Sequence, residues 1–533
     1  FSTPIDQDDL AKASARFPRP VIQCSEPSLS APSAKKILGK LHHKSPLRWL
    51  ESGTINVYGT FQGAHLKPRS RVRHTLLADR IMQERGWTLD VGAPTLGDWR
   101  PWRLAYLDTC NQEHVVSQSD IDACVSAYVT DVTRLLDAES IRNFQRLSMY
   151  DAINGIKGVK YIDKMNFNSS MGEPYNHSKK WHLLPEPRET APEGKVFDAE
   201  VTERIHKLRA TYESGKRGCS VFSGQQKDEA RSLKKLSEGM IRIFTACSTE
   251  LSVVVRELLL PFVKVFQENP LIFEGAPGAV CQSREWTKFR DYLTQFGVHR
   301  MIAGDYGKFD KKMLAEWILA AFEVIIRILM FAGWTDEECL PIWALAEDIA
   351  FPVVNMNGDL VMFFGSNPSG HPLTVIINCI VNALYMRYCY MKLSPSGDRA
   401  CLANFKRDVA LLTYGDDNAA GSRVDWFNHT AIVGVLKSIG VTYTMADKES
   451  KSVPFIHIDQ VSFLKRSWVW NAEANAFFCP LEQASIRKML LIACRSRTVS
   501  DEKHMSDVIR AAHQEWFWYG KEIFELENAY LRS

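Results

Sequence analysis

The chain has 533 residues, of which 45% are hydrophobic and 24% are charged, and its formal net charge is +3. This length allows several lobes around a large buried core, and the hydrophobic content excludes a disordered chain. This small net charge excludes a uniformly basic nucleic-acid binder. The 12 cysteines form no Cys-x-x-Cys or His/Cys pattern typical of a zinc site, and their arrangement suits a reducing compartment.

The first 150 residues combine loops rich in proline and serine with a few regular elements. Apolar spacing predicts a strand near residues 54–61 and helices near residues 74–85 and 120–137. Two basic stretches, at residues 35–44 and 67–73, are candidates for contact with RNA because Lys and Arg pair with phosphates.

Positive charge is concentrated between residues 204 and 242, where ten basic residues accompany four acidic ones. Such a segment would attract a triphosphate or an RNA backbone. For residues 204–217 we favour the alternative of a solvated helix face with i,i+4 ion pairs. Residues 227–242 therefore remain the better candidates for phosphate binding.

Two acidic residues follow an apolar stretch at residues 296–303. That stretch predicts a strand ending at Gly304, which places Asp305 at the strand tip. A helix predicted over residues 311–331 comes next, so either Asp305 or Asp310 could cap it. Capping suits Asp310 better because it lies nearer to the helix start.

Two long apolar segments, residues 315–334 and 374–391, contain charged or amide side chains. We therefore expect core helices and no transmembrane segment. In the second segment Thr374 and Asn378 share one helix face. Asn378 paired with Asp310 could read a ribose hydroxyl; the alternative is a satisfied core or cap network, which we favour for Asn382.

Adjacent carboxylates, Asp416 and Asp417, follow a predicted buried strand at residues 409–414, and Gly415 permits a tight turn before them. The pair could be ordinary turn residues. If Asp305 lies beside them, however, these hard oxygen ligands would suit two Mg²⁺ or Mn²⁺ ions, the arrangement used in phosphoryl transfer.

Seven segments, in order, resemble the motifs of viral RNA-dependent RNA polymerases. The patterns Asp-x₄-Asp, Ser-Gly-x₃-Thr-x₃-Asn and Tyr-Gly-Asp-Asp, which begin at Asp305, Ser369 and Tyr414, are similar to motifs A, B and C. Four other segments resemble motifs G, F, D and E: residues 169–175, 227–242, 444–448 and 463–466. The picornavirus-like positive-strand group is most similar, and shorter stretches resemble marnaviruses and dicistroviruses.

The resemblance implies an α+β right hand with fingers, a palm built on a split-βαβ core, and a helical thumb. The implied divisions are residues 1–150 for an N-terminal extension and fingertips, 151–265 for fingers, 266–340 for the palm with motif A, 341–367 for an insertion hairpin, 368–470 for the palm with motifs B to E, and 471–533 for the thumb. The hairpin also has a signal of its own, because Asn357-Gly358 favours a type I′ turn.

The resemblance also implies roles for individual residues. Asp305, Asp416 and Asp417 would bind metal ions, and the triphosphate would be bound by Lys227, Arg231, Lys235 and Arg242. Ribose would be selected by Asp310, Thr374 and Asn378, and Ser369 would lie in a loop beside the nucleotide. Lys448 would donate a proton to the departing pyrophosphate. The resemblance assigns RNA contacts to Ser170, Gly172, Pro174, Gly370, Lys465 and Arg466. Without the resemblance, Lys448 would be interpreted as a surface ion pair with Asp447.

Two positions depart from the family pattern. Met240 stands where many relatives have a lysine, so Lys234 or Lys235 could supply the missing cation. Glu173 places an acid near the expected phosphate path, which weakens the template contacts expected around it.

The expected partners are RNA template and primer, nucleoside triphosphates, a small VPg-like protein primer, and a second copy of the chain. The sequence starts with Phe1, as expected for a processed product or for a fragment of a longer chain. The resemblance implies a product cut from a polyprotein, which acts in the host cytoplasm at membrane-associated replication complexes. Two alternatives remain: a reverse transcriptase, which usually has Tyr-x-Asp-Asp without the motif B helix, and a catalytically silent RNA-binding scaffold.

Overall fold

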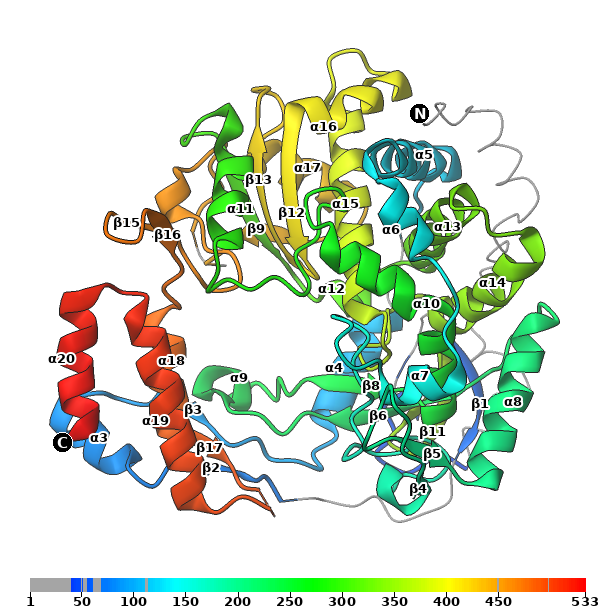
Figure 1. Ribbon diagram of the computed structural model, residues 1–533, viewed down its shortest axis with the longest axis horizontal. Helices are drawn as coiled ribbons and strands as arrows, with labels where there is room; N and C mark the ends of the chain where they lie inside the picture. The colour runs from blue at the N-terminus through cyan, green and yellow to red at the C-terminus, as the bar shows by residue number, and fades with distance from the viewer. Residues whose placement is uncertain are drawn as a thin grey trace.

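The computed structural model describes residues 40–48, 50, 55–60, 69–110, 114–447, 450–496 and 498–533. The helices and strands are arranged as a closed ring of ribbons, with helices α19 (Asp501–Phe517) and α20 (Lys521–Arg532) on one side (Figure 1). Helices α5 (Gln118–Leu135) and α13 (Ala315–Phe331) lie on the opposite side.

A four-stranded antiparallel sheet carries the acidic residues singled out in the sequence. Its order is β12 (Val409–Tyr414), β13 (Asp417–Ser422), β9 (Met301–Tyr306) and β14 (Tyr443–Met445). One face packs against helices α15 (Thr374–Leu393) and α17 (His429–Ser438), and the other packs against α11 (Glu285–Leu293). The sheet is therefore buried on both sides, and its acidic residues lie at one end.

Strand β9 starts later than the sequence predicted. Residues 294–296 form a 3₁₀ turn and Gly297 has φ 114°, a conformation that favours glycine. The chain therefore turns before Met301, and Asp305 lies inside the strand instead of beyond its tip.

The helix predicted over residues 311–331 is divided into α12 (Phe309–Lys312) and α13. Met313 and Leu314 between them are extended. The carbonyl groups of Asp310 and Met313 accept hydrogen bonds from the backbone N–H groups of Asn367 and Ser366. This tertiary contact uses carbonyls that a continuous helix would have bonded internally.

The predicted hairpin is confirmed but belongs to a larger sheet. Strands β10 (Val353–Met356) and β11 (Asp359–Phe363) are joined by Asn357 and Gly358, both with positive φ. They extend a five-stranded sheet of order β1-β11-β10-β6-β8, with β1 at Ile55–Thr60, β6 at Val221–Gln226 and β8 at Ile243–Ala246. Residues 341–350, expected in the same insertion, instead complete helix α14 (Asp336–Ala350).

Three of the five basic residues of α8 (Ala199–Glu213) and the turn after it do not form the i,i+4 pairs that we favoured, whereas Lys207 and Lys216 are exposed as expected. Arg204 and Arg209 pair with Glu250 and Glu257 of α10 (Thr249–Glu268), and Arg217 pairs with Asp348 of α14. All three carboxylates are buried, so these cations neutralise acids of neighbouring helices. None of the helices in the described ranges has the length and hydropathy needed to span a bilayer.

The C-terminal helices close the ring against the N-terminal part of the chain. Strand β17 (Ile492–Cys494) pairs with β2 (Val72–His74), and α18 (Gln483–Leu491) packs on α3 (Ala78–Arg85). This contact joins the segments that the resemblance assigns to the fingertips and the thumb. Of the two basic stretches expected to touch RNA, residues 35–39 and 67–68 lie outside the described residues, whereas Arg71 and Arg73 form ion pairs with acidic side chains of the protein.

Candidate active site

Strand register brings the acidic residues of two distant segments together. Tyr414 pairs with Asp417 across the β12–β13 hairpin, leaving Gly415 and Asp416 as its two-residue turn, with φ 66° at Gly415. On the other side of β13, Asn418 pairs with Gly304. Asp417 and Asp305 are the next positions on these neighbouring strands, and their charges interact. The predicted convergence of these acids is confirmed.

Charge repulsion marks the same cluster. The pKa of Asp417 is raised to about 7, chiefly by burial and also by the negative charges of Asp416 and Asp305, against the hydrogen bond that the Leu464 N–H donates to it (2.6 Å). The pKa of Asp310 is raised to about 6 by burial and by Asp416. The four carboxylates thus share one electrostatic environment.

The carboxylates are not arranged as a preformed metal site. Within the described ranges, no three His, Cys, Asp or Glu side chains are grouped so that they could hold a metal ion. The donor set still fits a hard divalent cation, because several carboxylates with mutual repulsion lie at the end of one sheet. A bound cation would draw them closer together.

Buried polar side chains form hydrogen bonds that hold the β12–β13 turn in place. The Asn382 carbonyl accepts hydrogen bonds from the Tyr306 hydroxyl and the Asn418 amide (both 3.0 Å), and its own amide donates to the Gly415 carbonyl (3.0 Å). Tyr443 donates to Asn418 (2.7 Å). The interpretation of Asn382 as a satisfied core residue is confirmed.

The structure brings Asp310 and Asn378 together, as expected for a ribose site. The Asn378 amide donates to Asp310 Oδ1 at 2.6 Å. Asp310 does not cap the helix, because Lys308 occupies the N-cap position of α12 and no side chain caps that helix. The capping role that we preferred for Asp310 was therefore wrong. Thr374 is not directed at Asp310: its hydroxyl lies 2.8 Å from the Pro368 carbonyl and 2.9 Å from that of His371.

The loop that precedes α15 is held against strand β8. The Ser369 N–H and hydroxyl contact Thr245, and Gly370 forms a parallel bridge with Ala246. A Cβ on Gly370 would lie 2.3 Å from the Thr245 carbonyl oxygen, so only glycine fits there. The motif B loop and the segment after motif F are thus in direct contact.

Three of the predicted triphosphate ligands surround one acid that sequence reasoning did not single out. Glu229 lies 3.1 Å from Lys227, 3.5 Å from Arg231 and 3.6 Å from Arg242. Burial and the charge of Arg242 lower the pKa of Arg231. The position of Glu229 within a basic segment was the available signal. Lys235 lies on the adjacent short helix α9 (Leu233–Ser237).

The segment that resembles the template-entry motif is a tight loop. Gly172 has φ 75°, and a Cβ there would lie 2.6 Å from the Cys247 carbonyl oxygen. The buried Lys179 ammonium donates to the Ser170 carbonyl (2.8 Å). Pro174 is exposed in this loop.

Glu173 lies in the template-entry loop but does not present its charge to an RNA path. Its carboxylate is buried and accepts hydrogen bonds from Asn176 (2.8 Å) and Asn355 (2.9 Å). Trp181, which stacks on His177 after this loop, is 76% exposed, and the sequence did not distinguish it.

The remaining predicted site residues lie in different settings. The Lys465 side chain is 65% exposed and pairs with Glu482, whereas Arg466 is 11% exposed and makes a bidentate pair with Glu515 of α19. Arg466 therefore joins palm and thumb and is poorly placed for the expected primer contact. Lys448 lies outside the described residues.

Comparison with known families supports the motif assignment. A family model of viral RNA-dependent RNA polymerases matches residues 116–525. The chain is 28% identical over 455 residues to the replicase polyprotein of Drosophila C virus, an alignment that covers 80% of this chain and 25% of the polyprotein. It is 26% identical over 420 residues to the replicase polyprotein of Cricket paralysis virus, covering 74% and 23%. The chain thus spans about a quarter of the length of these relatives.

A solved structure described as a Sicinivirus 3Dpol RNA dependent RNA polymerase superimposes with a TM-score of 0.70. The match covers 90% of this chain and 93% of that one, at 17% sequence identity. The predicted α+β right-hand fold is therefore confirmed.

Proposed function

The chain belongs to the viral RNA-dependent RNA polymerase family, and we propose that it replicates the genome of a positive-strand RNA virus by template-directed joining of ribonucleotides. One observation carries this proposal. Acidic residues from β9, the β12–β13 turn and α12 converge beside an amide at the start of α15, where a nucleotide's phosphates and ribose could be held together.

Members of this family generally depend on divalent metal ions, and we assign that role here to Mg²⁺, with Mn²⁺ as a substitute. Asp305 and Asp416 would hold the ions, with Asp417 supporting one. When bound, such ions would lower the pKa of the attacking hydroxyl and stabilise negative charge on the leaving oxygen. The protein contributes the arrangement of carboxylates, which Asn382 and Leu464 hold in place through the Gly415 carbonyl and the Asp417 side chain.

The cations around Glu229 would bind the triphosphate of the incoming nucleotide. Lys227, Arg231 and Arg242 carry more positive charge than Glu229 neutralises, and Lys235 adds to it from α9. Ser369 would lie beside the nucleotide, and Asp310 with Asn378 would recognise its ribose. For Lys448, proton donation to pyrophosphate rests on the motif resemblance alone.

The RNA strands would contact the loops that surround this centre. The tight loop containing Ser170, Gly172 and Pro174 would guide the template. Gly370 would lie close to the template strand. Lys465 is exposed and available to the primer backbone, whereas Arg466 would act by holding the thumb. Residues that bind phosphate position the strands without reading their sequence.

Other partners follow from the likeness to viral replicases. We propose a small VPg-like protein as primer, self-association of the polymerase, and action in the host cytoplasm at membrane-associated replication complexes. The replicase polyproteins that the chain resembles support a viral role, and the remaining three quarters of their length lies beyond the matched region.

Extension of a primed RNA template tests the proposed function. Wild-type protein with Mg²⁺ should add each of the four ribonucleotides opposite its complement and add the four deoxyribonucleotides far less well. Equal use of deoxyribonucleotides would favour a reverse transcriptase. RNA binding without extension in either Mg²⁺ or Mn²⁺ would favour the scaffold.

A further inference from the structure

Two buried side chains connect the loop before α15 to the Asp310–Asn378 pair. Asn367 is 2% exposed and His371 is 5% exposed, although both lie in a loop beside the candidate active site. Neither has a role in the function proposed above. Their hydrogen bonds form a continuous path that ends at Asp310.

The path begins with a histidine whose protonation state is fixed by its surroundings. Burial lowers the pKa of His371 to about 3, so the ring is neutral and has one donor and one acceptor nitrogen. Nδ1 lies 3.3 Å from the backbone N of Leu373 and therefore accepts its hydrogen bond. Nε2 must then carry the proton, and it donates to Asn367 Oδ1 at 3.0 Å.

This hydrogen bond sets the orientation of the Asn367 amide. With Oδ1 occupied by His371, the Nδ2 group points to Asn378 Oδ1 at 2.8 Å. The backbone N–H of Asn367 also donates to the Asp310 carbonyl (3.0 Å), so the residue is anchored beside the acid. Because Asn378 Oδ1 accepts the hydrogen bond from Asn367, the Asn378 Nδ2 group faces Asp310 and donates to its Oδ1 at 2.6 Å.

The direction of this path matters because an amide can rotate by half a turn with little change in shape. A rotated Asn378 would place its carbonyl oxygen against the Asp310 carboxylate, so that two acceptors would face each other. It would also leave an Asn367 donor without its partner in a buried site, which is costly. The path from His371 removes that alternative.

We propose that Asn367 and His371 are positioning residues for ribose recognition, which hold the Asn378 amide so that the Asp310 carboxylate remains the acceptor for a nucleotide's 2′-hydroxyl. This inference rests on the proposed function, because it concerns the nucleotide bound at the same site. A site built to bond a hydroxyl rejects the analogue that lacks it, since the buried acceptor is then left unpaired. Deoxyribonucleotides would therefore lose the contact that ribonucleotides make.

The substitution Asn367→Asp tests the path with almost no change in volume. It replaces the donor that faces Asn378 Oδ1 with an acceptor, so Asn378 should rotate away from its present pairing. We expect the ratio of kcat/KM for ribonucleotides to that for deoxyribonucleotides to fall about tenfold. The matched control is Asn154→Asp, since Asn154 is another buried asparagine whose amide donates to two backbone carbonyls. The control should leave the ratio unchanged.

Two substitutions of the histidine separate positioning from general loss of structure. His371→Leu removes the donor and should lower the ratio, whereas His371→Gln can still donate to Asn367 and should restore most of it. Equal losses with ribonucleotides and deoxyribonucleotides in Asn367→Asp and His371→Leu would overturn the inference. Thermal unfolding of each variant shows whether the fold is retained.

Equilibrium binding of GTP and dGTP provides the same ratio without turnover. If the wild-type protein extends no primer, the proposed function fails, yet this binding ratio still reports on the inference. If the wild type extends RNA and the variants keep the wild-type binding ratio, the inference alone fails.

Discussion

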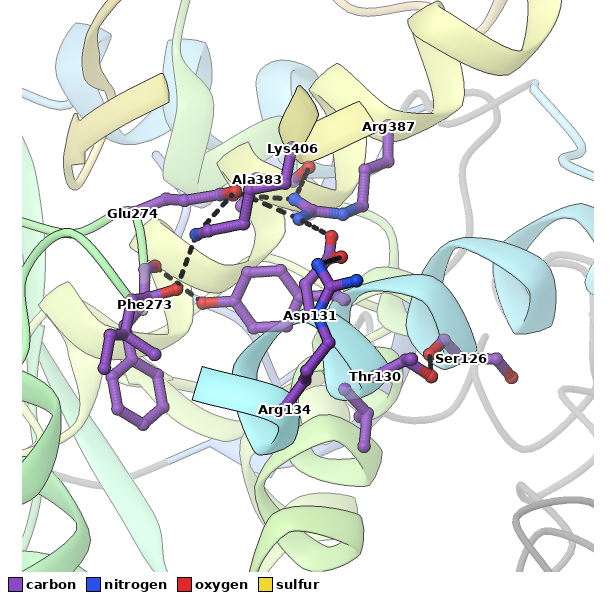
Figure 2. A network of polar contacts seen from close by, with 12 residues as sticks. Ser126, Thr130, Asp131, Arg134, Phe273, Glu274, Ala383, Arg387 and Lys406 are labelled. Carbon is purple, nitrogen blue, oxygen red and sulfur yellow. Dashed lines mark hydrogen bonds and ion pairs between the residues drawn. The ribbon is translucent and has the colours of Figure 1, made fainter. Parts of the chain in front are cut away.

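Two groups of carboxylates lie near opposite ends of helix α15, and they are neutralised in different ways. Asn378 near the start of the helix contacts the acidic cluster of Asp310, Asp416, Asp417 and Asp305. Arg387 lies nine residues later, about 13 Å along the helix axis, among buried acids from other parts of the chain (Figure 2).

The second group is balanced within the protein. Arg387 makes hydrogen bonds to Glu274 (2.7 and 3.0 Å) and to Asp131 of α5 (2.7 Å). Lys406, in the short helix α16 (Phe405–Asp408), lies 3.3 Å from Glu274 and donates to two backbone carbonyls. Burial alone would raise the pKa of Glu274, but Arg387 and Lys406 bring it below its usual value. Two cations thus match two acids.

Asp417 in the acidic cluster is not balanced in this way. Burial raises the pKa of Asp417 and neighbouring carboxylates raise it further, with no cationic side chain among the causes. The balanced group also supports the other one, because the Glu274 carbonyl accepts hydrogen bonds from the N–H (2.9 Å) and hydroxyl (2.8 Å) of Thr413 in β12. The balanced group is therefore a fixed support for the strand that leads to the acidic cluster.

The largest effect is expected from Asp416→Asn. The amide keeps the shape of the side chain but removes a charge that a metal ion would use, so primer extension should fall by roughly a thousandfold or more. Stability should stay equal or rise, because repulsion with Asp417 and Asp310 is relieved. RNA affinity, measured by fluorescence anisotropy, should change little. Substantial residual turnover would remove Asp416 from the metal site.

The balanced group should respond in the opposite way. Arg387→Met leaves Glu274 and Asp131 buried without their main partner, which should lower the free energy of unfolding by about 3–5 kcal/mol. Denaturant titration measures this change.

Arg134→Met is the matched control for that substitution. Arg134 is largely exposed and approaches Asp131 at 3.6 Å, so its loss should cost less than about 1 kcal/mol. Similar losses for the two variants would show that the buried group is not the support that its geometry indicates.

Asp417 and Glu274 should also differ in how they make stability depend on pH. The pKa of Asp417, raised to about 7 from 3.8, means that the folded protein retains a proton that the unfolded chain releases. Its stabilising contribution is complete at about pH 4 and is lost as pH rises towards 7. Glu274 has the opposite sign, because its lowered pKa stabilises the fold above about pH 4.5 and that contribution is lost on acidification.

Unfolding temperatures measured from pH 4.5 to 7.5 in EDTA test this difference. Asp417→Asn should reduce the fall in unfolding temperature as pH rises. In separate samples with Mg²⁺ in place of EDTA, the ion should stabilise the wild type more at pH 7.5 than at pH 5, since protons compete with the metal for the carboxylates. A Mg²⁺ effect that does not depend on pH would contradict the assignment.

The sequence predicted the acidic cluster better than the balanced group because only the cluster stands in recognisable motifs. Asp305 and Asp416 are also far apart in the chain, and it was the resemblance of their short patterns to polymerase motifs A and C that indicated that they meet. Glu274 and Arg387 are 113 residues apart, and Asp131 is 256 residues from Arg387, so nothing local indicates that they meet. The same limit explains the errors at Arg204, Arg209 and Arg217, whose partners lie on other helices.

Element boundaries failed where tertiary contacts compete with local preference. The strand before Asp305 was predicted too early because Gly297 turns the chain, and the helix after Asp310 is interrupted because two of its carbonyls bond residues 366 and 367. The hairpin at Asn357-Gly358 was predicted correctly because its turn depends on two adjacent residues. That it joins a sheet with β1, β6 and β8 could not be inferred from the hairpin itself.

The smallest expected effect compares two asparagines one turn apart on α15. Asn378 touches Asp310, whereas Asn382 is fully buried and satisfied by Tyr306, Asn418 and Gly415. Asn378→Ala should relax the preference for ribonucleotides about tenfold, and it should also cost some stability because it leaves the buried Asn367 donor unpaired. Asn382→Ala should leave that preference unchanged and lower stability by about 1–3 kcal/mol, because it leaves buried donors and an acceptor unpaired. Single-nucleotide incorporation and thermal unfolding, measured on both variants, separate the two outcomes. An unchanged ratio in Asn378→Ala would exclude it from ribose selection and would leave α15 as a support along its whole length.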